Sequence, residues 1–586
     1  MLKFPLVLIT LFSTTLLPAQ SNWSPKIDPA LLQRLEKDST ADFLLVMTDQ
    51  ADVSAADNLT AKEAKGQYVF NTLSAFAEKS QKSVLEFLRS QKAPSQSFWV
   101  VNAIKSTGTL QLIQTLAQRQ DVAQIQANSH SSLNYFTDNA PTNLNTVLDT
   151  ATIPWGLIRI HADSVWAMGI RGQGAVVGGE DTGYDWTHPA IQKAYRGWDG
   201  KTANHNYNWH DAIHADTSKH GNPCGYDITH PCDDQSHGTH TMGTMIGTDS
   251  ATQHYIGVAP AARWIGARNM DSNNGTLGSY VEAFQWFIAP TDTLNHNPRP
   301  DLSPDVINNS WYCAIEEGCN STNFFILEKA MNNTRASGIV VVVSVGNAGP
   351  NCSSATGPPG FFAKAFSIGA TSENDTIAGF SSRGPVTIDS SGRLKPDVSA
   401  PGVHVISSVL NHGYASYSGT SMSGPHTVGT VALMISANPK LRGQVSVIEQ
   451  IIKSTAKPLQ SAQSCGTISG SSIPNNTYGY GRIDALAAVK AALAYKSTPT
   501  DDLSAQPTVK AYPNPFTDQI NFEISNIPAK TSLALYNVTG QEVFSTPIAF
   551  AGSTLQTVSL AGLAKGMYFY RIWSETGNIS GKVFKE

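Results

Sequence analysis

The chain has 586 residues, of which 41% are hydrophobic and 15% are charged, and its formal net charge is −5 at pH 7. This length predicts several domains rather than one compact unit. The small net charge gives no electrostatic reason to expect a nucleic acid or an anionic membrane as a partner.

The first residues predict an exported protein. Lys3 supplies a positive charge, residues 4–18 are apolar and almost uncharged, and Ala19 is a small residue before a polar segment. This is the pattern of a signal peptide, here residues 1–19, and the apolar run is short for a membrane span. The alternative is a short N-terminal anchor. No later segment is apolar over the length of a membrane helix, so we expect the mature protein to be soluble.

Residues 20–140 predict a small domain of helices and strands. Short apolar runs at residues 43–47, 98–101 and 122–125 indicate strands. Apolar residues at helical spacing predict helices over residues 64–91 and 110–118. This order of strands and helices indicates an α/β unit packed on one side of a sheet.

Residues 141–497 have the pattern of a larger α/β domain. Runs such as 175–177 and 339–343 are apolar at every position rather than at every second one. Strands of this kind are buried on both faces and belong to parallel sheets covered by helices. We therefore expect a parallel-sheet domain with a substantial core.

The C-terminal part predicts a linker followed by a second small domain. Residues 498–508 are polar and without periodicity, as linkers are. In residues 509–586, apolar and polar side chains alternate around Ile520, Phe522 and Ile524, and again at residues 568–572. Several short alternating strands in a segment of this length predict a small β-sandwich.

Export favours disulfides over free thiols for the six cysteines. The two pairs that are close in the sequence would each close a single loop, and the remaining two cysteines are left for each other. The expected pairs are Cys224–Cys232, Cys313–Cys319 and Cys352–Cys465. Other connectivities stay open for the distant pair. No Cys-x-x-Cys spacing occurs, which argues against a zinc site.

The segment 419–425 (G-T-S-M-S-G-P) is the sharpest chemical signal in the sequence. A nucleophilic serine needs a rigid, exposed hydroxyl near a base and an oxyanion site. The small residues around Ser421 allow a tight entry into a helix, where the backbone N–H of Ser421 can face a developing oxyanion. Taken alone, the segment could equally be a capped helix that opens on a serine-rich loop.

Three other segments supply what such a serine needs. His237 stands before Gly-Thr at the start of a predicted helix and is the candidate general base. Asp181 ends an apolar strand at a sharp turn, where it can hold the imidazole in the right tautomer. Asn347 follows the run 339–343 in a glycine turn and can donate an amide N–H to an oxyanion. His237 and His240 lack the H-E-x-x-H spacing of a metalloprotease, so His240 is interpreted as structural.

These segments together resemble the subtilase family, the subtilisin-like serine proteases. D-T-G, H-G-T-H, G-N-A-G and G-T-S-M-S-G-P occur at residues 181, 237, 346 and 419 onward, in the family's order Asp, His, Ser. The resemblance covers about residues 150–497 and implies a subtilisin-like α/β fold. It implies a catalytic triad of three residues, namely Asp181, His237 and Ser421. Asn347 is then an oxyanion donor, and Ser310 and Trp311 are expected to bind the substrate backbone.

Two departures from the family pattern affect what the resemblance implies. Many subtilases have a calcium-binding aspartate soon after their His-Pro dipeptide, whereas Ala190 follows Pro189 here. The implied mechanism requires no cofactor, and with that aspartate absent no metal ligand is assigned and calcium binding is left open. Tyr312 and Cys313 stand where the family often has glycines that line the specificity pocket. The preferred substrate residue is therefore not predicted.

The two ends of the chain also resemble parts of exported subtilases. Residues 20–140 fit an inhibitory propeptide by their position and by their order of strands and helices, which implies a zymogen. Residues 512–516 (Y-P-N-P-F) and 566–568 resemble the sorting domain of the bacterial type IX secretion system. This implies the secretion machinery as a partner and a secreted or cell-attached enzyme. The alternative is a β-sandwich that binds carbohydrate or stabilises the enzyme.

The expected function is hydrolysis of peptide bonds in extracellular proteins, through an acyl-enzyme on Ser421. The expected partners are protein or peptide substrates and the chain's own propeptide, with no nucleic acid, and the enzyme is expected to be a monomer. An esterase is disfavoured, because Ser423 stands where the nucleophile elbow G-x-S-x-G needs glycine. An inactive binding module built on this scaffold would ordinarily lack a member of the triad, and none is missing.

Overall fold

The computed structural model describes residues 24–128, 153–215, 221–249, 254–313, 319–496, 508–527, 531–548, 552–574 and 577–586. The expected signal peptide (residues 1–19) lies outside these ranges. So do the expected boundary near residue 140 and every residue of the expected linker except Thr508, which already belongs to a strand. Among the described residues, no helix is both long and apolar enough to cross a membrane.

The N-terminal unit (residues 24–128) is a four-stranded antiparallel sheet in the order β2-β3-β1-β4 with helices packed on it. Its elements are α1 (Pro29–Leu35), β1 (Ala41–Met47), α2 (Lys62–Ser90), β2 (Ser95–Phe98), β3 (Ala103–Gly108), α3 (Leu110–Ala117) and β4 (Val122–Ala127). The strand expected at residues 98–101 is wrong, because β2 ends at Phe98 and Trp99–Val101 form a 3-10 turn. Val100 and Val101 are apolar because they pack between helices of the next unit.

Strand β1 is buried on both faces, which differs from the expected one-sided packing. Phe43 and Leu45 face the unit's own core with Val84 of α2. Leu44 and Val46 face the other way, into a core that they share with the central unit. The sheet of the N-terminal unit is therefore covered on its second face by another part of the chain.

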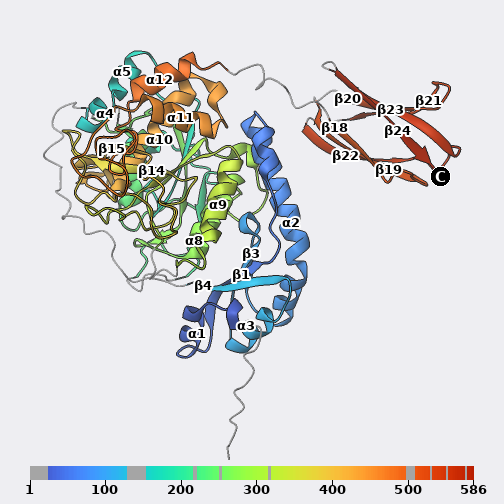
Figure 1. The fold of residues 1–586 in the computed structure, drawn as a ribbon, viewed down its shortest axis with the longest axis horizontal. Helices are drawn as coiled ribbons and strands as arrows, with labels where there is room; N and C mark the ends of the chain where they lie inside the picture. The colour runs from blue at the N-terminus through green and yellow to red at the C-terminus, as the bar shows by residue number, and fades with distance from the viewer. Residues whose placement is uncertain are drawn as a thin grey trace, which may run out of the picture.

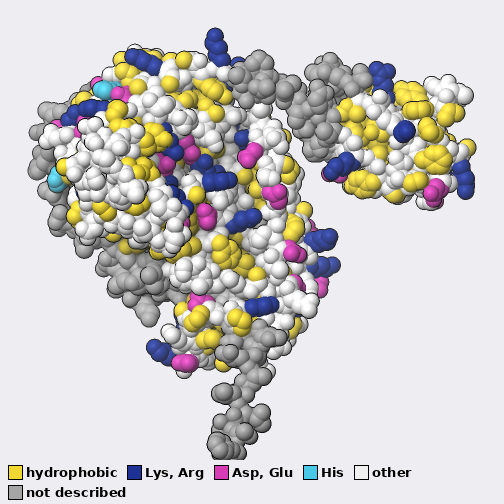
Figure 2. Space-filling model, viewed as in Figure 1, with side chains coloured by type: hydrophobic (Ala, Val, Ile, Leu, Met, Phe, Trp, Pro, Cys, Tyr) yellow, Lys and Arg dark blue, Asp and Glu magenta, His cyan; other side chains and the backbone are white. Residues whose placement is uncertain are grey.

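Helix α2 divides its apolar stripe between the same two cores. Val69 and Leu73, in its first half, pack in the core shared with the central unit, whereas Val84 and Leu88 pack on the unit's own sheet. Figure 1 shows α2 running alongside the helices α8 (Leu277–Ile288) and α9 (Phe324–Ala336). Lysine, arginine and acidic side chains are interspersed along its solvent side (Figure 2).

The central unit (residues 153–496) is built on a seven-stranded sheet in which every paired strand is parallel, as the uninterrupted apolar runs predict. In sheet order the strands are β15 (Val398–Pro401), β14 (Phe366–Thr371), β13 (Val340–Ser344), β12 (Val306–Asn309), β5 (Val176–Asp181), β9 (Arg263–Arg268) and β6 (Trp209–Asp211). All five residues of β13 are buried. The expected fold class is confirmed.

Helices cover both faces of this sheet. One face carries the core with α5 (Ala162–Ala167), α7 (His237–Ile246), α10 (Thr420–Ala437), α11 (Val445–Thr455) and α12 (Ala485–Ala494). The other face carries α8, α9 and, beyond them, the N-terminal unit. The short elements are α4 (Trp155–Arg159), α6 (Pro189–Gln192), β7 (Thr248–Asp249), β8 (His254–Tyr255), β10 (Met270–Asp271), β11 (Asn274–Gly275), β16 (Val405–Val409) and β17 (Gly413–Tyr417).

The C-terminal unit is a β-sandwich of two antiparallel sheets, with strand orders β18-β19-β22 and β21-β20-β23-β24. Its strands are β18 (Thr508–Tyr512), β19 (Gln519–Ile527), β20 (Thr531–Tyr536), β21 (Glu542–Ile548), β22 (Gly552–Ser559), β23 (Gly566–Ser574) and β24 (Gly577–Lys585). Ile520 and Phe522 of one sheet share a core with Leu533 and Ile572 of the other. The alternating pattern thus marks the buried positions of both sheets.

Candidate active site

Asp181 and His237 meet at the carboxyl end of strand β5 in the seven-stranded sheet. Asp181 is its last residue, and His237 is the first residue of α7. Asp181 Oδ1 lies 2.6 Å from His237 Nδ1, and both side chains are buried. The same carboxylate accepts hydrogen bonds from the Thr182 backbone N–H (2.8 Å) and from Thr241 Oγ1 (3.2 Å). A proton on Nδ1 that is donated to Asp181 places the lone pair on Nε2, which is the state that a general base needs.

Ser421 lies at the start of α10, whose N-cap is Gly419. Its hydroxyl donates to the carbonyl of Ser310 (3.2 Å), and the Ser310 hydroxyl donates to the Ser421 carbonyl (2.8 Å). Ser421 is only 4% exposed. Helix α10 packs against α7, which carries His237. Two helix starts therefore bring the histidine and the serine to the same end of the sheet.

The side chain of Asn347 is oriented by the residue before Ser421. Its Oδ1 accepts hydrogen bonds from both the backbone N–H and the Oγ1 of Thr420, each at 2.9 Å. With the oxygen held in this way, the amide group presents its NH2 on the other side, beside Gly419. An amide fixed in this orientation can stabilise an oxyanion without reorganising.

A cavity of about 400 Å³ lies beside Ser421. Asn347, Ser310 and Trp311 line it, together with Tyr312 and the disulfide-bonded Cys313 and Cys319. Trp311 stacks on Tyr280 of α8, with ring centroids 3.9 Å apart. The described lining contains no charged side chain. Ser421, Asn347, Ser310 and Trp311, which the sequence singled out, therefore line one cavity, with a disulfide in its wall.

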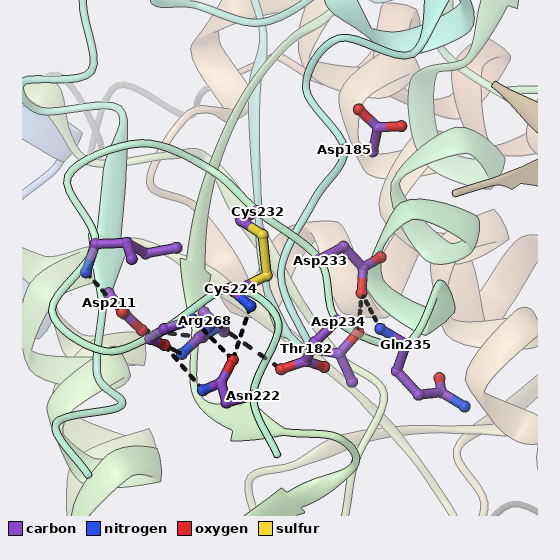
Figure 3. Close-up of a disulfide and its surroundings, with 12 residues drawn as sticks. Thr182, Asp185, Asp211, Asn222, Cys224, Cys232, Asp233, Asp234, Gln235 and Arg268 are labelled. Carbon is purple, nitrogen blue, oxygen red and sulfur yellow. Dashed lines mark hydrogen bonds and ion pairs between the residues drawn. A yellow bond between two sulfur atoms is a disulfide. The ribbon is translucent and has the colours of Figure 1, made fainter. Parts of the chain in front are cut away.

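The structure contains the three expected disulfides, Cys224–Cys232, Cys313–Cys319 and Cys352–Cys465. The first closes a loop that ends directly before Asp233 (Figure 3), four residues ahead of His237. The third links segments that are 113 residues apart in the sequence.

His240 has contacts that suit a structural residue. Its Nε2 lies 3.0 Å from the carbonyl of Val405 and 3.2 Å from that of Ala415, and its ring stacks on Tyr417. Burial lowers the pKa of His240 to about 3, so the ring is neutral. It joins the hairpin of β16 and β17 to α7.

His188 closes the segment at which the family resemblance left calcium binding open. His188 Nδ1 accepts the backbone N–H of Ala190 and so caps α6, while its Nε2 lies 2.9 Å from the carbonyl of Gly413. An imidazole engaged on both sides does not fit a hard oxygen-loving cation. Among the described residues, no group of three or more His, Cys, Asp or Glu side chains is arranged to hold a metal ion.

Residues 172–481, more than half of the chain, match the Subtilase family. The chain belongs to the subtilase family. Residues 510–586 of this subtilase match the secretion system C-terminal sorting domain, so the expected type IX sorting domain is confirmed. The sorting domain marks the protein for export to the cell surface or the medium.

Curated relatives agree with this assignment. The subtilase is 33% identical over 495 residues to Bacillopeptidase F of Bacillus subtilis (strain 168), covering 80% of this chain and 32% of the relative. It is 33% identical over 236 residues to Serine protease AprX of the same organism, covering 36% of this chain and 51% of the relative. Subtilisin DY of Bacillus licheniformis is 31% identical over 310 residues, covering 53% of this chain and 93% of the relative. The chain thus spans about a third of Bacillopeptidase F and half of AprX.

Several contacts of the site could not be predicted from the sequence. Thr182, Thr241 and Thr420 lie inside or beside the quoted motifs, yet no spacing rule identifies which of their neighbours they contact. Asp233 stands four residues before His237, and only the fold of its loop gives it partners near the site. The pairing of Trp311 with Tyr280 joins two elements that are distant in the sequence.

Proposed function

We propose that this subtilase is a secreted endopeptidase that hydrolyses peptide bonds of extracellular proteins through an acyl-enzyme on Ser421. The observation that carries the proposal is the buried contact of 2.6 Å between Asp181 Oδ1 and His237 Nδ1, at the sheet end where α10 presents Ser421. No cofactor enters this chemistry.

In this mechanism His237 Nε2 takes the proton from the Ser421 hydroxyl as its oxygen attacks the scissile carbonyl. Asp181 holds the imidazole and stabilises its protonated form. The Asn347 amide and the Ser421 backbone N–H donate to the oxyanion of the tetrahedral intermediate. His237 then protonates the leaving amine, and water hydrolyses the ester by the same route in reverse.

The substrate is proposed to lie along Ser310 and Trp311 and to place one side chain in the adjacent cavity. Because the described lining is uncharged and includes Tyr312 and Phe324, a bulky apolar side chain is the best match.

The N-terminal unit is proposed to be an inhibitory propeptide (residues 20–140) of a peptidase domain (residues 141–497). Asn128, the last described residue of that unit, accepts a hydrogen bond from the backbone N–H of Gly278 (2.8 Å), in the first turn of α8. Tyr280 of the same turn lines the cavity. The chain therefore leaves the unit beside the site that a propeptide must occupy. Residues 498–508 and 509–586 are proposed as the linker and the removable sorting domain.

The nucleophile is tested with a fluorophosphonate probe and a casein digest. The Ser421→Ala variant should lose both labelling and digestion. Ser423→Ala, a buried serine two residues along the same helix, is the matched control and should remain labelled. Casein digestion by purified Ser421→Ala enzyme at the wild-type rate would refute the proposal.

A further inference from the structure

The carboxylate of Asp233 accepts an unusually large number of hydrogen bonds for one buried side chain. Its Oδ1 accepts from Thr182 Oγ1 (2.8 Å) and from the backbone N–H groups of Gln235 (2.9 Å) and Ser236 (3.0 Å). Its Oδ2 accepts from the backbone N–H (2.9 Å) and the Oγ1 (2.6 Å) of Thr239. All five donors belong to two short segments, one after Asp181 and one around the start of α7.

These donors flank the two residues that form the buried pair. Thr182 follows Asp181, and its backbone N–H donates to the Asp181 carboxylate. Thr182 Oγ1 also accepts the backbone N–H of Gly238, which follows His237 (3.0 Å). Asp233 and Thr182 therefore tie the end of β5 to the first turn of α7. His237 Nδ1 and Asp181 Oδ1, which must stay within hydrogen-bond distance, are thus held together through the residues that follow each of them.

The backbone beside this link is closely packed and leaves no space for a side chain at Gly183. Gly183 has φ +112°, and a Cβ there would lie 1.8 Å from the carbonyl oxygen of Cys232. That same carbonyl accepts the backbone N–H of Tyr184 (3.2 Å). Cys232 and Asp233 thus lie directly against the turn that follows Asp181.

The loop that ends in Asp233 is fixed at its other end to the central sheet. The disulfide joins Cys232 to Cys224, and the next residue, Gly225, accepts a hydrogen bond from Arg268 Nη2 (2.6 Å). Arg268 is the last residue of β9, lies opposite Asp181 in the parallel register, and donates its Nε to Asp211 (3.1 Å). Figure 3 shows this sequence of contacts from Asp211 and Arg268, past the disulfide, to Asp233.

From this arrangement we infer that Asp233 is a positioning residue for the His237–Asp181 pair, and that the Cys224–Cys232 disulfide holds it in place. The inference rests on the proposed function, because it concerns the geometry of the proposed base. Asp233 touches neither the substrate nor the reacting atoms and acts through Thr182 and the first turn of α7. Small displacements of a catalytic group reduce turnover by up to about 100-fold.

The test is Asp233→Asn in the full-length chain, with activity on a peptide anilide expressed per active site counted by fluorophosphonate titration. An amide keeps the size of the side chain but cannot accept all five hydrogen bonds. We expect kcat to fall by on the order of 10- to 100-fold, with KM nearly unchanged. We also expect the acid limb of the kcat/KM profile to move to lower pH, since a looser contact between His237 and Asp181 would stabilise the protonated imidazole less. A purely structural role would lower the number of active sites and leave both readouts unchanged.

Matched variants make the outcome specific. Asp185→Asn changes an aspartate of the same turn whose carboxylate accepts hydrogen bonds from the backbone N–H and Oγ1 of Thr187, and it should behave as wild type. Cys224→Ser/Cys232→Ser should shift kcat and the acid limb in the same direction as Asp233→Asn, by roughly 3- to 10-fold in kcat. If Asp233→Asn does not fold, Thr182→Val should show the loss and Thr182→Ser should restore it.

The outcomes separate this inference from the proposed function. Wild-type enzyme without labelling or activity would contradict the proposed function itself. Labelled wild type together with an Asp233→Asn or Thr182→Val enzyme of normal kcat and normal acid limb would overturn the positioning role alone. A disulfide-free enzyme of normal kcat and acid limb would overturn the role of the disulfide.

Discussion

Lys62 anchors the N-terminal unit far from the active site, and its replacement by methionine should release that unit more readily. Lys62 is the first residue of α2 and is only 6% exposed. Its Nζ donates to the backbone carbonyl of Ser303 (2.8 Å) and to the Ser303 hydroxyl (2.7 Å), which belong to the central unit. Methionine keeps the apolar stem and removes both hydrogen bonds.

The size of the effect follows from opposing contributions. A hydrogen bond to a charged group contributes about 1.5–3 kcal/mol, and the Ser303 carbonyl would lose a partner. Removing the buried ammonium offsets part of this loss, because a buried charge is unfavourable. Burial lowers the pKa of Lys62, although the negative charge of Asp305 raises it. We expect a net loss of about 1–3 kcal/mol, which corresponds to a roughly 5- to 150-fold weaker association.

The assay follows the appearance of peptidase activity after the full-length chain is purified. Lys62→Met should shorten the lag before full activity, because the cleaved unit dissociates sooner. Lys82→Met removes an exposed lysine from the same helix and should leave the lag unchanged. A melting curve of each variant in the Ser421→Ala background checks that the unit stays folded. Equal lags for Lys62→Met and wild type would refute the anchoring role.

Two further predictions concern stability, both measured in the Ser421→Ala background to prevent autolysis. A disulfide that closes a longer loop removes more conformational entropy from the unfolded chain. Removing Cys352–Cys465, with a separation of 113 residues, should therefore lower the free energy of unfolding by about 4.7 kcal/mol, and removing Cys224–Cys232, with a separation of 8, by roughly 2.5 kcal/mol. Equal losses in urea titrations would contradict this explanation. Burial disfavours the charged ring of His214, but the carboxylate of Glu282, 3.0 Å from Nε2, raises the pKa of His214 to about 9. The stabilisation of the fold by protonated His214 is then complete below pH 6.5 and is lost as the pH rises through 9. Wild type should therefore lose more of its melting temperature over this range than His214→Gln, and parallel curves would rule the ion pair out as the cause.

The sequence predicted the parts of this molecule that depend on short segments. Runs such as 339–343 are apolar throughout because both faces of the sheet are covered, and the motifs around Asp181, His237 and Ser421 are contiguous in the chain. The order of these segments, together with the parallel sheet, indicated where they would meet.

What could not be predicted depends on contacts between distant segments. Lys62 and Ser303 are 241 residues apart, and nothing in either segment indicates the other. Val100 and Val101 suggested a strand, since adjacent apolar residues are common in buried strands. In the structure they form a 3-10 turn that packs in the core shared with the central unit. The role of Asp233 arises from a loop whose course is set by a disulfide and by Arg268, so that its five donors come together only in the folded chain.

The double-sided burial of β1 has a consequence for the direction of activation. On the proposed release of the N-terminal unit as a propeptide, Leu44 and Val46 and the part of the shared core that belongs to the central unit would become exposed to water together. A released sheet with an apolar face is poorly protected and presents extended strands to the peptidase that it has just left. Digestion of the freed unit removes it from the binding equilibrium, so mass action no longer favours rebinding. Under the proposed propeptide role, each activated molecule would digest freed inhibitory units, and activation of the whole population would be irreversible.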